Sequence, residues 1–357
     1  MYDIVKEGDA VIKIKRTDKI SKDMEVFYNP IMKINRDISI LLLNSVDSKN
    51  MQIALPLAGS GIRGIRFLKE LKKNKIKNLS FNDYSAKAIG SIKNSLKLNK
   101  IKNNKNISIY NDDANLFLLN SNGFDYIDVD PFGTSNFYLD AAIKRISRNG
   151  ILAVTNTDTA ALAGTYPKTC VSKYWSVPKK DYMMHETGLR ILIRKIQLIG
   201  MQYNKALLPM FSYFKDHYFR IFFKCVKGKR GVDKIAENQG MFNDTGPLWL
   251  GSLFDSKLVN RMNSALLKKH NEKNSIKNNI ELIKFLKIIK DESKINVVGF
   301  YDIHDIVEKE KIKTIKKKRD IIKKIRKKGF KASGTHFSGT GIRSDISYSK
   351  LLALLRG

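Results

Sequence analysis

The sequence predicts an α/β protein in which a mostly parallel sheet is followed by a smaller C-terminal domain. From residue 51 onward, short apolar runs alternate with stretches of helical length, which is the pattern of strands and crossover helices in parallel sheets. Glycine and acidic residues follow several of the expected strands, where such sheets place their ligand-binding loops. With 357 residues, 43% of them hydrophobic, the chain is long enough for two buried cores.

The expected elements of the sheet domain follow one another in order. Short runs rich in apolar residues are predicted as strands: 51–55, 78–81, 107–110, 124–129, 150–155 and 218–226. Longer stretches with helical periodicity are predicted as helices: 62–73, 85–98, 138–146 and 187–199. Gly150 supplies a turn into the fifth strand, and the run YFRIFFKCV is expected as the last strand, which closes the unit.

A change in amino-acid composition marks the expected domain boundary. Residues 227–246 are poor in apolar side chains and rich in Gly, Asn and Asp. Beyond them, helical patterns at 281–290 and 307–328 flank a strand-like run at 296–301. We therefore divide the chain into an N-terminal segment (1–50), a sheet domain (51–227) and a C-terminal domain (228–357).

The positive charge of the chain points to a polyanionic partner. The sequence has 66 Lys and Arg against 34 Asp and Glu, a net charge of +32, of which residues 228–357 contribute +15. Such an excess attracts nucleic acid or an anionic membrane surface. A uniformly basic proteome explains the same excess without any such partner, so the charge alone leaves the partner open.

The cysteines and the apolar runs exclude several classes of protein. Cys170 and Cys225 are too few for a disulfide framework or a four-cysteine zinc site, and we expect both to be buried. No apolar run approaches the ~20 residues that span a bilayer. The N-terminus MYDIVKEGDA lacks the apolar core of a signal peptide. We therefore expect a cytoplasmic protein that does not enter the membrane.

A glycine loop lies between the first expected strand and the first expected helix. Gly59, Gly61 and Gly64 match the pattern G-x-G-x-x-G, in which glycine lets the backbone turn sharply and approach a ligand closely. An ordinary strand-to-helix turn produces the same pattern, so the loop alone is weak evidence. It makes Gly59 a candidate for cofactor binding.

Acidic residues follow the next two strands. Asp83 ends the second strand, where a carboxylate can bind ribose hydroxyls, and Asp113 with Ala114 follows the third, where an acidic pair can bind an adenine edge. N-capping of the following helices is the alternative for each residue. Up to this point a nicotinamide enzyme and a methyltransferase that uses S-adenosylmethionine are equally possible.

The end of the fourth strand favours the methyltransferase. There the sequence Asp130-Pro131-Phe132-Gly133 combines a carboxylate, a rigid turn and an aromatic ring. An exocyclic amino group of a nucleobase is a poor nucleophile, so its methylation requires an acceptor for its hydrogens and a flat face for the base. Asp130 and Phe132 can supply these. An Asp-Pro turn with Phe132 in the core is the structural alternative.

The N-terminal segment contains a further candidate. Arg36 lies in a stretch where apolar residues alternate with charge, and it can reach the carboxylate of a bound methionine group. A surface ion pair with Asp37 or Glu25 explains it equally well from spacing alone.

Several long motifs together resemble one family. The strings KISKDMEVFYNPIMKINRDISILLL, GSGIRGIRF, DPFG, GPLWLGSLFD, THF and TGIRSD resemble the archaeal and eukaryotic tRNA guanine-26 N2,N2-dimethyltransferases. The resemblance implies a class I S-adenosylmethionine-dependent methyltransferase with a Rossmann-like sheet, an N-terminal extension contributing to the active site, and an α+β C-terminal domain that binds tRNA. It implies that two methyl groups pass in succession from S-adenosylmethionine to the N2 amine of one guanine.

The resemblance also assigns roles to individual residues. Matching of motifs places cofactor binding on Arg36, Arg66, Asp83, Asp113 and Ala114, and the catalytic carboxylate on Asp130. Phe27 and Phe132 resemble the two aromatic residues that hold a flipped guanine. The segment 226–246 departs from the family, because it is short and lacks the cysteines of a zinc site that many members carry. We therefore expect no metal.

Some expectations concern the C-terminal domain and the rival functions. The run from Lys309 to Lys331 predicts an amphipathic helix with Ile312, Ile315, Ile322 and Ile325 on its apolar side and a basic face toward RNA phosphates or solvent. We expect a monomer without an obligate protein partner. A methyltransferase for another guanine N2 or for adenine N6, and a non-catalytic RNA-binding protein on the same scaffold, stay open as alternatives. A nicotinamide-dependent dehydrogenase is the third rival, but it has no evident use for DPFG.

Overall fold

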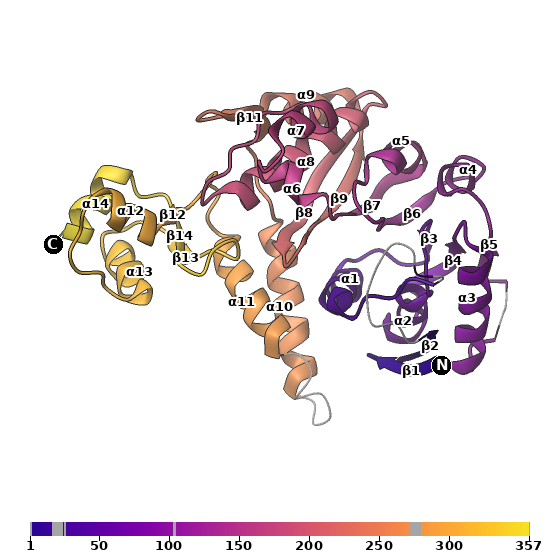
Figure 1. Ribbon diagram of the computed structural model, residues 1–357. Coiled ribbons are helices and arrows are strands. Elements are labelled where there is room, and N and C mark those ends of the chain that lie inside the picture. The colour runs from indigo at the N-terminus through magenta and orange to yellow at the C-terminus, as the bar shows by residue number, and fades with distance from the viewer. Residues whose placement is uncertain (1, 16–23, 25, 103–104, 272–279, 357) are drawn as a thin grey trace. The chain divides into compact units, whose positions relative to one another are not determined.

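The computed structural model describes residues 2–15, 24, 26–102, 105–271 and 280–356 (Figure 1). The chain divides into two compact units, each made of separate segments. The first contains residues 1–157, 198–208 and 220–232, and the second contains residues 158–197, 209–219 and 233–357. No helix in the described part of the chain is long and apolar enough to cross a membrane.

The described residues form a seven-stranded sheet with the order β5-β4-β3-β6-β7-β9-β8. In that order the strands are β5 (Ile107–Tyr110), β4 (Ile76–Asn82), β3 (Met51–Leu55), β6 (Phe124–Val129), β7 (Ile146–Asn156), β9 (Tyr218–Lys227) and β8 (Lys205–Lys215). The pairings β4–β5, β3–β4, β3–β6 and β6–β7 are parallel. The central strands β3 and β6 are almost entirely buried, as strands covered on both faces are. The α/β domain predicted from the sequence is present.

Five helices between or before these strands belong to the first unit. They are α1 (Lys33–Ser45), α2 (Ile62–Glu70), α3 (Ala86–Leu98), α4 (Ala114–Leu119) and α5 (Asn136–Arg145). Ser85 caps α3 and Asp113 caps α4 with its side chain, which fixes where these helices begin. A Cβ on Gly64 in α2 would lie only 2.1 Å from the Phe81 ring of β4, so glycine is required for α2 to pack on the sheet.

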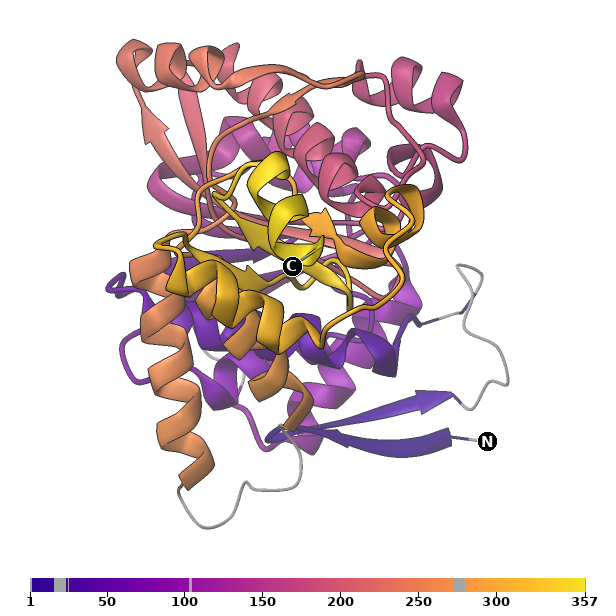
Figure 2. The ribbon, with the colours of Figure 1, turned by 90° about the vertical axis from the view of Figure 1, so that its left-hand side faces the viewer.

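A two-stranded ribbon precedes the sheet. The strands β1 (Tyr2–Glu7) and β2 (Ala10–Lys15) are antiparallel and lie beside one another near the N-terminus (Figure 2). The backbone of Val11 exchanges hydrogen bonds with the side chain of Asn99, which follows α3. The ribbon is thereby tied to the helical layer of the first unit.

The residues of the second unit all come after β7 in the sequence. Its elements include α6 (Thr159–Leu162), α7 (Pro167–Tyr174), most of α8 (Met184–Met201), most of α9 (Lys229–Glu237), β10 (Gln239–Phe242), β11 (Thr245–Trp249), α10 (Ser256–Asn271) and α11 (Ile280–Glu292). The helices α10 and α11 lie side by side (Figures 1 and 2).

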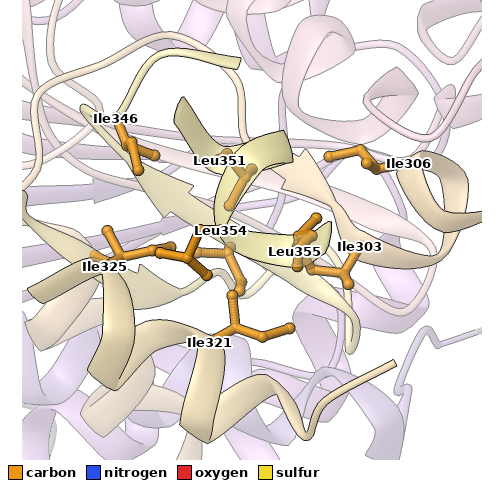
Figure 3. Packing of buried hydrophobic residues seen from close by; sticks show 10 residues of the cluster. Ile303, Ile306, Ile321, Ile325, Ile346, Leu351, Leu354 and Leu355 are labelled. Atoms are coloured by element: carbon orange, nitrogen blue, oxygen red, sulfur yellow. The ribbon is translucent and has the colours of Figure 1, made fainter. Parts of the chain in front are cut away.

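The C-terminal part of the second unit has its own apolar core (Figure 3). It consists of the sheet β12-β14-β13 and three helices: β12 (Tyr301–Asp302), β13 (Ala332–Gly334), β14 (Gly341–Ser344), α12 (Ile303–Lys309), α13 (Lys318–Lys327) and α14 (Tyr348–Arg356). Figure 3 shows Ile321 and Ile325 of α13 beside Leu354 and Leu355 of α14. The opposite side of α13 is basic and exposed.

Two expectations for this region are wrong. The helix expected at 307–328 is interrupted between α12 and α13, where Lys311 has a left-handed φ of 50° that an α-helix cannot contain. Ile315, expected on the apolar side, is consequently 45% exposed. The run expected as a strand at 296–301 contains a turn at Gly299, whose φ is 80°, and only Tyr301 enters β12.

Candidate functional site

A pocket opens at the carboxyl ends of β3 and β6, where parallel sheets bind their ligands. Its walls come from the segment before α1, the glycine turn after β3, and the end of β6. The lining residues are Phe27, Tyr28, Asn29, Arg36, Leu55, Leu57, Ala58, Gly59, Ser60, Ile62, Arg63, Asp128 and Asp130. The pocket thus brings together four of the residues predicted from the sequence: Phe27, Arg36, Gly59 and Asp130.

The glycine turn forms one wall of the pocket. Gly59 and Gly61 have left-handed φ angles of 54° and 77°, which side chains other than glycine rarely adopt. A Cβ on Gly59 would lie 3.1 Å from the backbone oxygen of Phe27, to which the Ser60 N–H donates a hydrogen bond. The turn therefore packs tightly against the N-terminal segment. Gly59 and Ser60 of this turn also line the pocket.

Asp83 and Asp113 lie outside the pocket lining, at the ends of neighbouring strands. Asp83 accepts hydrogen bonds from the backbone N–H groups of Gly59 (2.8 Å) and Ser85 (3.0 Å). Asp113 accepts from Asn115 (2.8 Å) and Leu116 (3.1 Å), which is the N-cap contact that sequence reasoning offered as an alternative. Asp83 thus supports the glycine turn directly.

Tyr138 of α5 lies close to both of these carboxylates. Burial raises the pKa of its hydroxyl, and the negative charges of Asp113 and Asp83 raise it further. The Tyr138 hydroxyl is therefore influenced by the carboxylates at both strand ends. Ala114, the first residue of α4, is buried next to Asp113.

Arg36 enters the pocket wall from the first turn of α1 and is held in place by Glu7. Its Nε and Nη2 donate to the two Glu7 oxygens at 2.7 and 2.5 Å, and Nη2 also donates to the Asn29 carbonyl at 3.0 Å. Tyr28 donates to Glu7 at 3.1 Å. Burial opposes the ionisation of Glu7, but Arg36 and Arg66 outweigh it and lower its pKa.

Arg66 lies behind Arg36, outside the pocket lining. It is buried and donates to Glu7 (2.9 Å) and Glu70 (2.7 and 2.9 Å), and it pairs with Asp37 (2.6 Å). Burial opposes its charge, yet these carboxylates raise its pKa overall. In this structure Arg66 contacts protein carboxylates and supports the wall that carries Arg36.

Asp130 directly follows the C-terminal end of β6 and is bound by Arg63 of α2. The guanidinium of Arg63 donates to Asp130, to the Asn35 side-chain oxygen (3.0 Å) and to the Ser39 hydroxyl (2.9 Å). The Asp130 side chain keeps 22% of its surface exposed, whereas that of Arg63 is 9% exposed. One carboxylate edge is thus anchored from within the protein while the residue still reaches the pocket.

A second carboxylate of β6 completes this network. Asp128 is fully buried and receives two hydrogen bonds of 2.8 Å from Arg220 of β9 and one of 2.5 Å from the Tyr126 hydroxyl. Burial opposes its charge, but Arg220 and Arg63 lower its pKa overall. The strand end that carries Asp130 is therefore charged and rigid.

The rest of the DPFG turn is pinned to β7. Gly133 has a left-handed φ of 73°, its N–H donates to the Thr157 hydroxyl (2.7 Å), and its carbonyl accepts from the Thr157 N–H (2.9 Å). Phe132 is 46% exposed, so it lies outside the core, contrary to the structural alternative. Its ring meets that of Phe27 edge to face, with 4.1 Å between the ring centroids.

Sequence reasoning missed several residues of the site. Arg63 lies inside the quoted GIRGIRF string one helical turn before Arg66, and that spacing was the available signal. Glu7, Asp128 and Arg220 gave none, since their contacts join segments far apart in sequence. Cys170 and Cys225 are buried, and the described residues contain no group of three or more His, Cys, Asp or Glu that could hold a metal ion.

Comparison with known proteins agrees with this geometry. A family model described as N2,N2-dimethylguanosine tRNA methyltransferase matches residues 8–245 and 240–356. The chain belongs to this methyltransferase family. The family predicted from the motifs is thereby confirmed.

Relatives of this methyltransferase family match along nearly the whole chain. The "tRNA (guanine(26)-N(2))-dimethyltransferase" of Methanocaldococcus jannaschii is 37% identical over 98% of this chain and 97% of its own. The "tRNA (guanine(26)-N(2)/guanine(27)-N(2))-dimethyltransferase" of Aquifex aeolicus is 36% identical over 98% and 95%.

A solved structure also matches along the whole chain. Trm1 of Pyrococcus horikoshii in complex with S-adenosyl-L-methionine has 35% identity and a TM-score of 0.88 over 99% of this chain and 100% of that one. The predicted fold class, a Rossmann-like methyltransferase sheet with a smaller C-terminal domain, is confirmed.

Proposed function

We propose that this methyltransferase transfers two methyl groups in succession from S-adenosylmethionine to the exocyclic N2 amine of guanine 26 in tRNA. The observation that carries the proposal is the pocket in which the Asp130 carboxylate faces a glycine turn and a buried arginine. The names of the relatives supply the substrate and the position, and the solved relative supplies the cofactor.

The residues around the glycine turn fit S-adenosylmethionine. Glycine at position 59 lets the turn pass close to the Phe27 backbone while its own backbone lines the pocket. Arg36, oriented by Glu7, faces the pocket with a cation suited to a carboxylate. Asp83, which bonds the Gly59 N–H, lies where ribose hydroxyls bind in such sheets. Asp113 and Ala114 begin α4 where we place the adenine edge.

Asp130 is the proposed catalytic residue. When bound, S-adenosylmethionine supplies an electrophilic methyl group. Asp130 accepts a hydrogen bond from the guanine N2 amine, which raises the electron density on the nitrogen, and it takes the proton that leaves after transfer. Arg63 donates to the carboxylate and holds it in place at the pocket, so little reorganisation is needed during the reaction.

Phe27 and Phe132 are proposed to hold the guanine after it leaves the RNA stack. Their rings touch in the structure, so a base enters between them only when one ring turns aside. Phe132 is the ring that can turn, because nearly half of it is exposed. Unstacking of the nucleotide costs a few kcal/mol, which stacking on the two rings offsets.

Nucleoside analysis of the product tests the proposal. A tRNA transcript is incubated with the enzyme and S-adenosylmethionine, digested and examined by mass spectrometry over time. We expect N2-methylguanosine to rise first and N2,N2-dimethylguanosine to replace it. Fragment mapping distinguishes guanine 26 from guanine 27, the second position in the name of the Aquifex aeolicus relative. Methylated adenine, or no methylated nucleoside, would contradict the proposal.

A further inference from the structure

The segment after β7 presents two exposed aromatic residues at the ends of one helix. Tyr166 precedes α7 and is 60% exposed, and Trp175 follows it and is 48% exposed. Nine residues of helical rise separate them by about 14 Å. Exposed apolar side chains that are rimmed by polar residues are a common feature of interaction surfaces. The proposed chemistry of the pocket uses neither ring.

Trp175 is held rigidly in its exposed position. Its backbone is left-handed, with a φ of 58°, which is uncommon for a bulky residue. The following residues fix it, since Ser176 donates to the Pro247 carbonyl (2.7 Å) and Val177 pairs with Gly246. Arg194 donates to the Trp175 carbonyl at 3.3 Å.

One face of the indole is covered by a cation. The Lys195 ammonium lies 2.9 Å from the ring centroid, and burial lowers the pKa of Lys195 to about 8. Because Lys195 occupies one face, a partner that stacks on this ring must approach the opposite face, and the residue is 48% exposed. A single open aromatic face of this kind suits one stacked planar group.

The chain around this face is mostly positive, although one of its exposed lysines, Lys179, pairs with Asp244 at 3.3 Å. Between Asp158 and Asp181 the sequence contains four lysines and no acidic residue. Lys168, Lys179 and Lys180 are exposed, as is Lys173, which pairs with Asp158. Aromatic faces flanked by lysine are the elements with which proteins bind unpaired nucleotides.

The chain connects this surface directly to the proposed catalytic turn. Thr157, which bonds Gly133 of the DPFG turn, is followed within two residues by α6 and then by α7. A strand end that positions Asp130 therefore continues into the segment that carries Tyr166 and Trp175.

We propose that the surface formed by Tyr166, Lys168, Trp175, Lys179 and Lys180 binds the tRNA substrate, with an unpaired base stacked on the open face of Trp175. The inference rests on the proposed function for the identity of the RNA. Lys168, Lys179 and Lys180 contact phosphates on either side of that base, and the fixed backbone at Trp175 keeps the ring ready for stacking without reordering.

Tryptophan fluorescence tests the contact without reference to activity. The chain has two tryptophans, and Trp249 is buried with its Nε1 bonded to the Ser252 carbonyl. Quenching by acrylamide therefore reports mainly Trp175. We expect a saturating tRNA transcript to reduce the quenching of the wild type by acrylamide. In Trp175→Phe only the shielded Trp249 remains, so we expect tRNA to leave the quenching of this variant unchanged. Undiminished quenching of the wild type with bound tRNA would overturn the inference.

A variant at the same position separates stacking from a structural role. Trp175→Asn removes the ring and keeps a residue that tolerates the left-handed backbone. We expect KM for tRNA to rise about ten-fold, with kcat and S-adenosylmethionine affinity near wild type, and Trp175→Phe to restore most of the affinity. Leu98→Asn, which alters a similarly exposed side chain at the end of α3, is the matched control. An unchanged KM in Trp175→Asn, or an equal rise in Leu98→Asn, would contradict the inference.

A duplex RNA distinguishes the stacked base from phosphate contact alone. A duplex with as many phosphates as the tRNA offers no unpaired base, so we expect it to bind without protecting Trp175. Equal protection by the duplex would contradict stacking. Because the quenching and duplex experiments measure binding without turnover, the surface can fail while dimethylation of guanine 26 stands. Conversely, loss of the product in mass spectrometry would refute the proposed function without touching the quenching result.

Discussion

Asp130 is the residue on which the proposed chemistry depends. Asp130→Ala removes the acceptor for the amine, and Asp130→Asn keeps its size but removes its charge and its ability to take a proton. We expect both to lower kcat by roughly 10²- to 10⁴-fold. S-adenosylmethionine affinity, measured by calorimetry, should stay near wild type because Arg36 and the glycine turn are intact. Wild-type turnover in either variant would remove Asp130 from this role.

Arg63 is expected to act through Asp130. Lysine at this position keeps a positive charge but cannot donate at once to Ser39, Asn35 and Asp130, as the guanidinium does. We expect Arg63→Lys to lower kcat about ten-fold or more, with KM for tRNA little changed. A rise in KM at unchanged kcat would show that Arg63 serves RNA binding instead.

Sequence reasoning at the residue scale succeeded where a motif lies on a strand end. Gly59 and Asp130 follow β3 and β6, and both line the pocket as neighbouring strand ends do. It could not foresee that Arg36 and Arg66 share Glu7, because that residue lies on a ribbon 29 and 59 positions away. Tertiary ion pairs of this kind leave no periodic trace in a sequence.

At the scale of elements, α13 is the segment best suited to contact RNA phosphates. Its buried Ile321 and Ile325 fix the opposite face outward, where Lys323, Lys327 and the following Lys328 are exposed. The affinity for tRNA falls with salt, and the slope of log affinity against log salt concentration reports how many phosphates the protein neutralises. Replacement of these lysines by glutamine should reduce the magnitude of this slope by up to about one for each phosphate contact that is lost. The measurement is filter binding over a range of salt concentrations.

Two lysines of α3 provide the control for that experiment. Lys93 and Lys97 are exposed on a helix of the sheet domain, and their replacement changes the net charge in the same direction. We expect the slope to change less there than in α13. Equal slopes in the α13 variant and the wild type would show that the basic face of α13 is merely solvated.

The elements themselves were predicted unevenly, for a physical reason. Strands such as β6 were found because a strand buried on both faces reads as a continuous apolar run. The single helix expected at 307–328 was wrong. Its apolar period continued across residues 311–317, although the left-handed backbone at Lys311 separates α12 from α13. The helical spacing of apolar residues shows which side of a helix is buried, but it does not show where the helix is interrupted.

At the scale of the whole molecule, buried ion pairs make the stability of the fold depend on pH. Glu292 ends α11 and accepts from Thr335, His336 and Arg343, all within the second unit. Burial opposes its ionisation, but His336 and Arg343 lower its pKa from 4.5 to about 2. A depressed pKa stabilises the folded state above the ordinary value, and this contribution is lost as pH falls from about 4.5 to about 2.

Glu292→Gln tests this dependence. The variant lacks the carboxylate and leaves part of the Arg343 charge uncompensated, so we expect its free energy of unfolding at pH 7 to be about 3 kcal/mol below wild type. The difference between the two proteins should shrink as the pH approaches 2, as measured by urea unfolding at several pH values. A constant difference over that range would show that Glu292 is not the titrating group.

The most direct test of the proposed function uses one tRNA transcript in two forms, with guanine or adenine at position 26. The enzyme and labelled S-adenosylmethionine are supplied to each at equal concentration. We predict close to two methyl groups incorporated per guanine-26 transcript, recovered as N2,N2-dimethylguanosine, and no incorporation at that position in the adenine form. Equal incorporation into both transcripts would contradict guanine 26 as the target of this site.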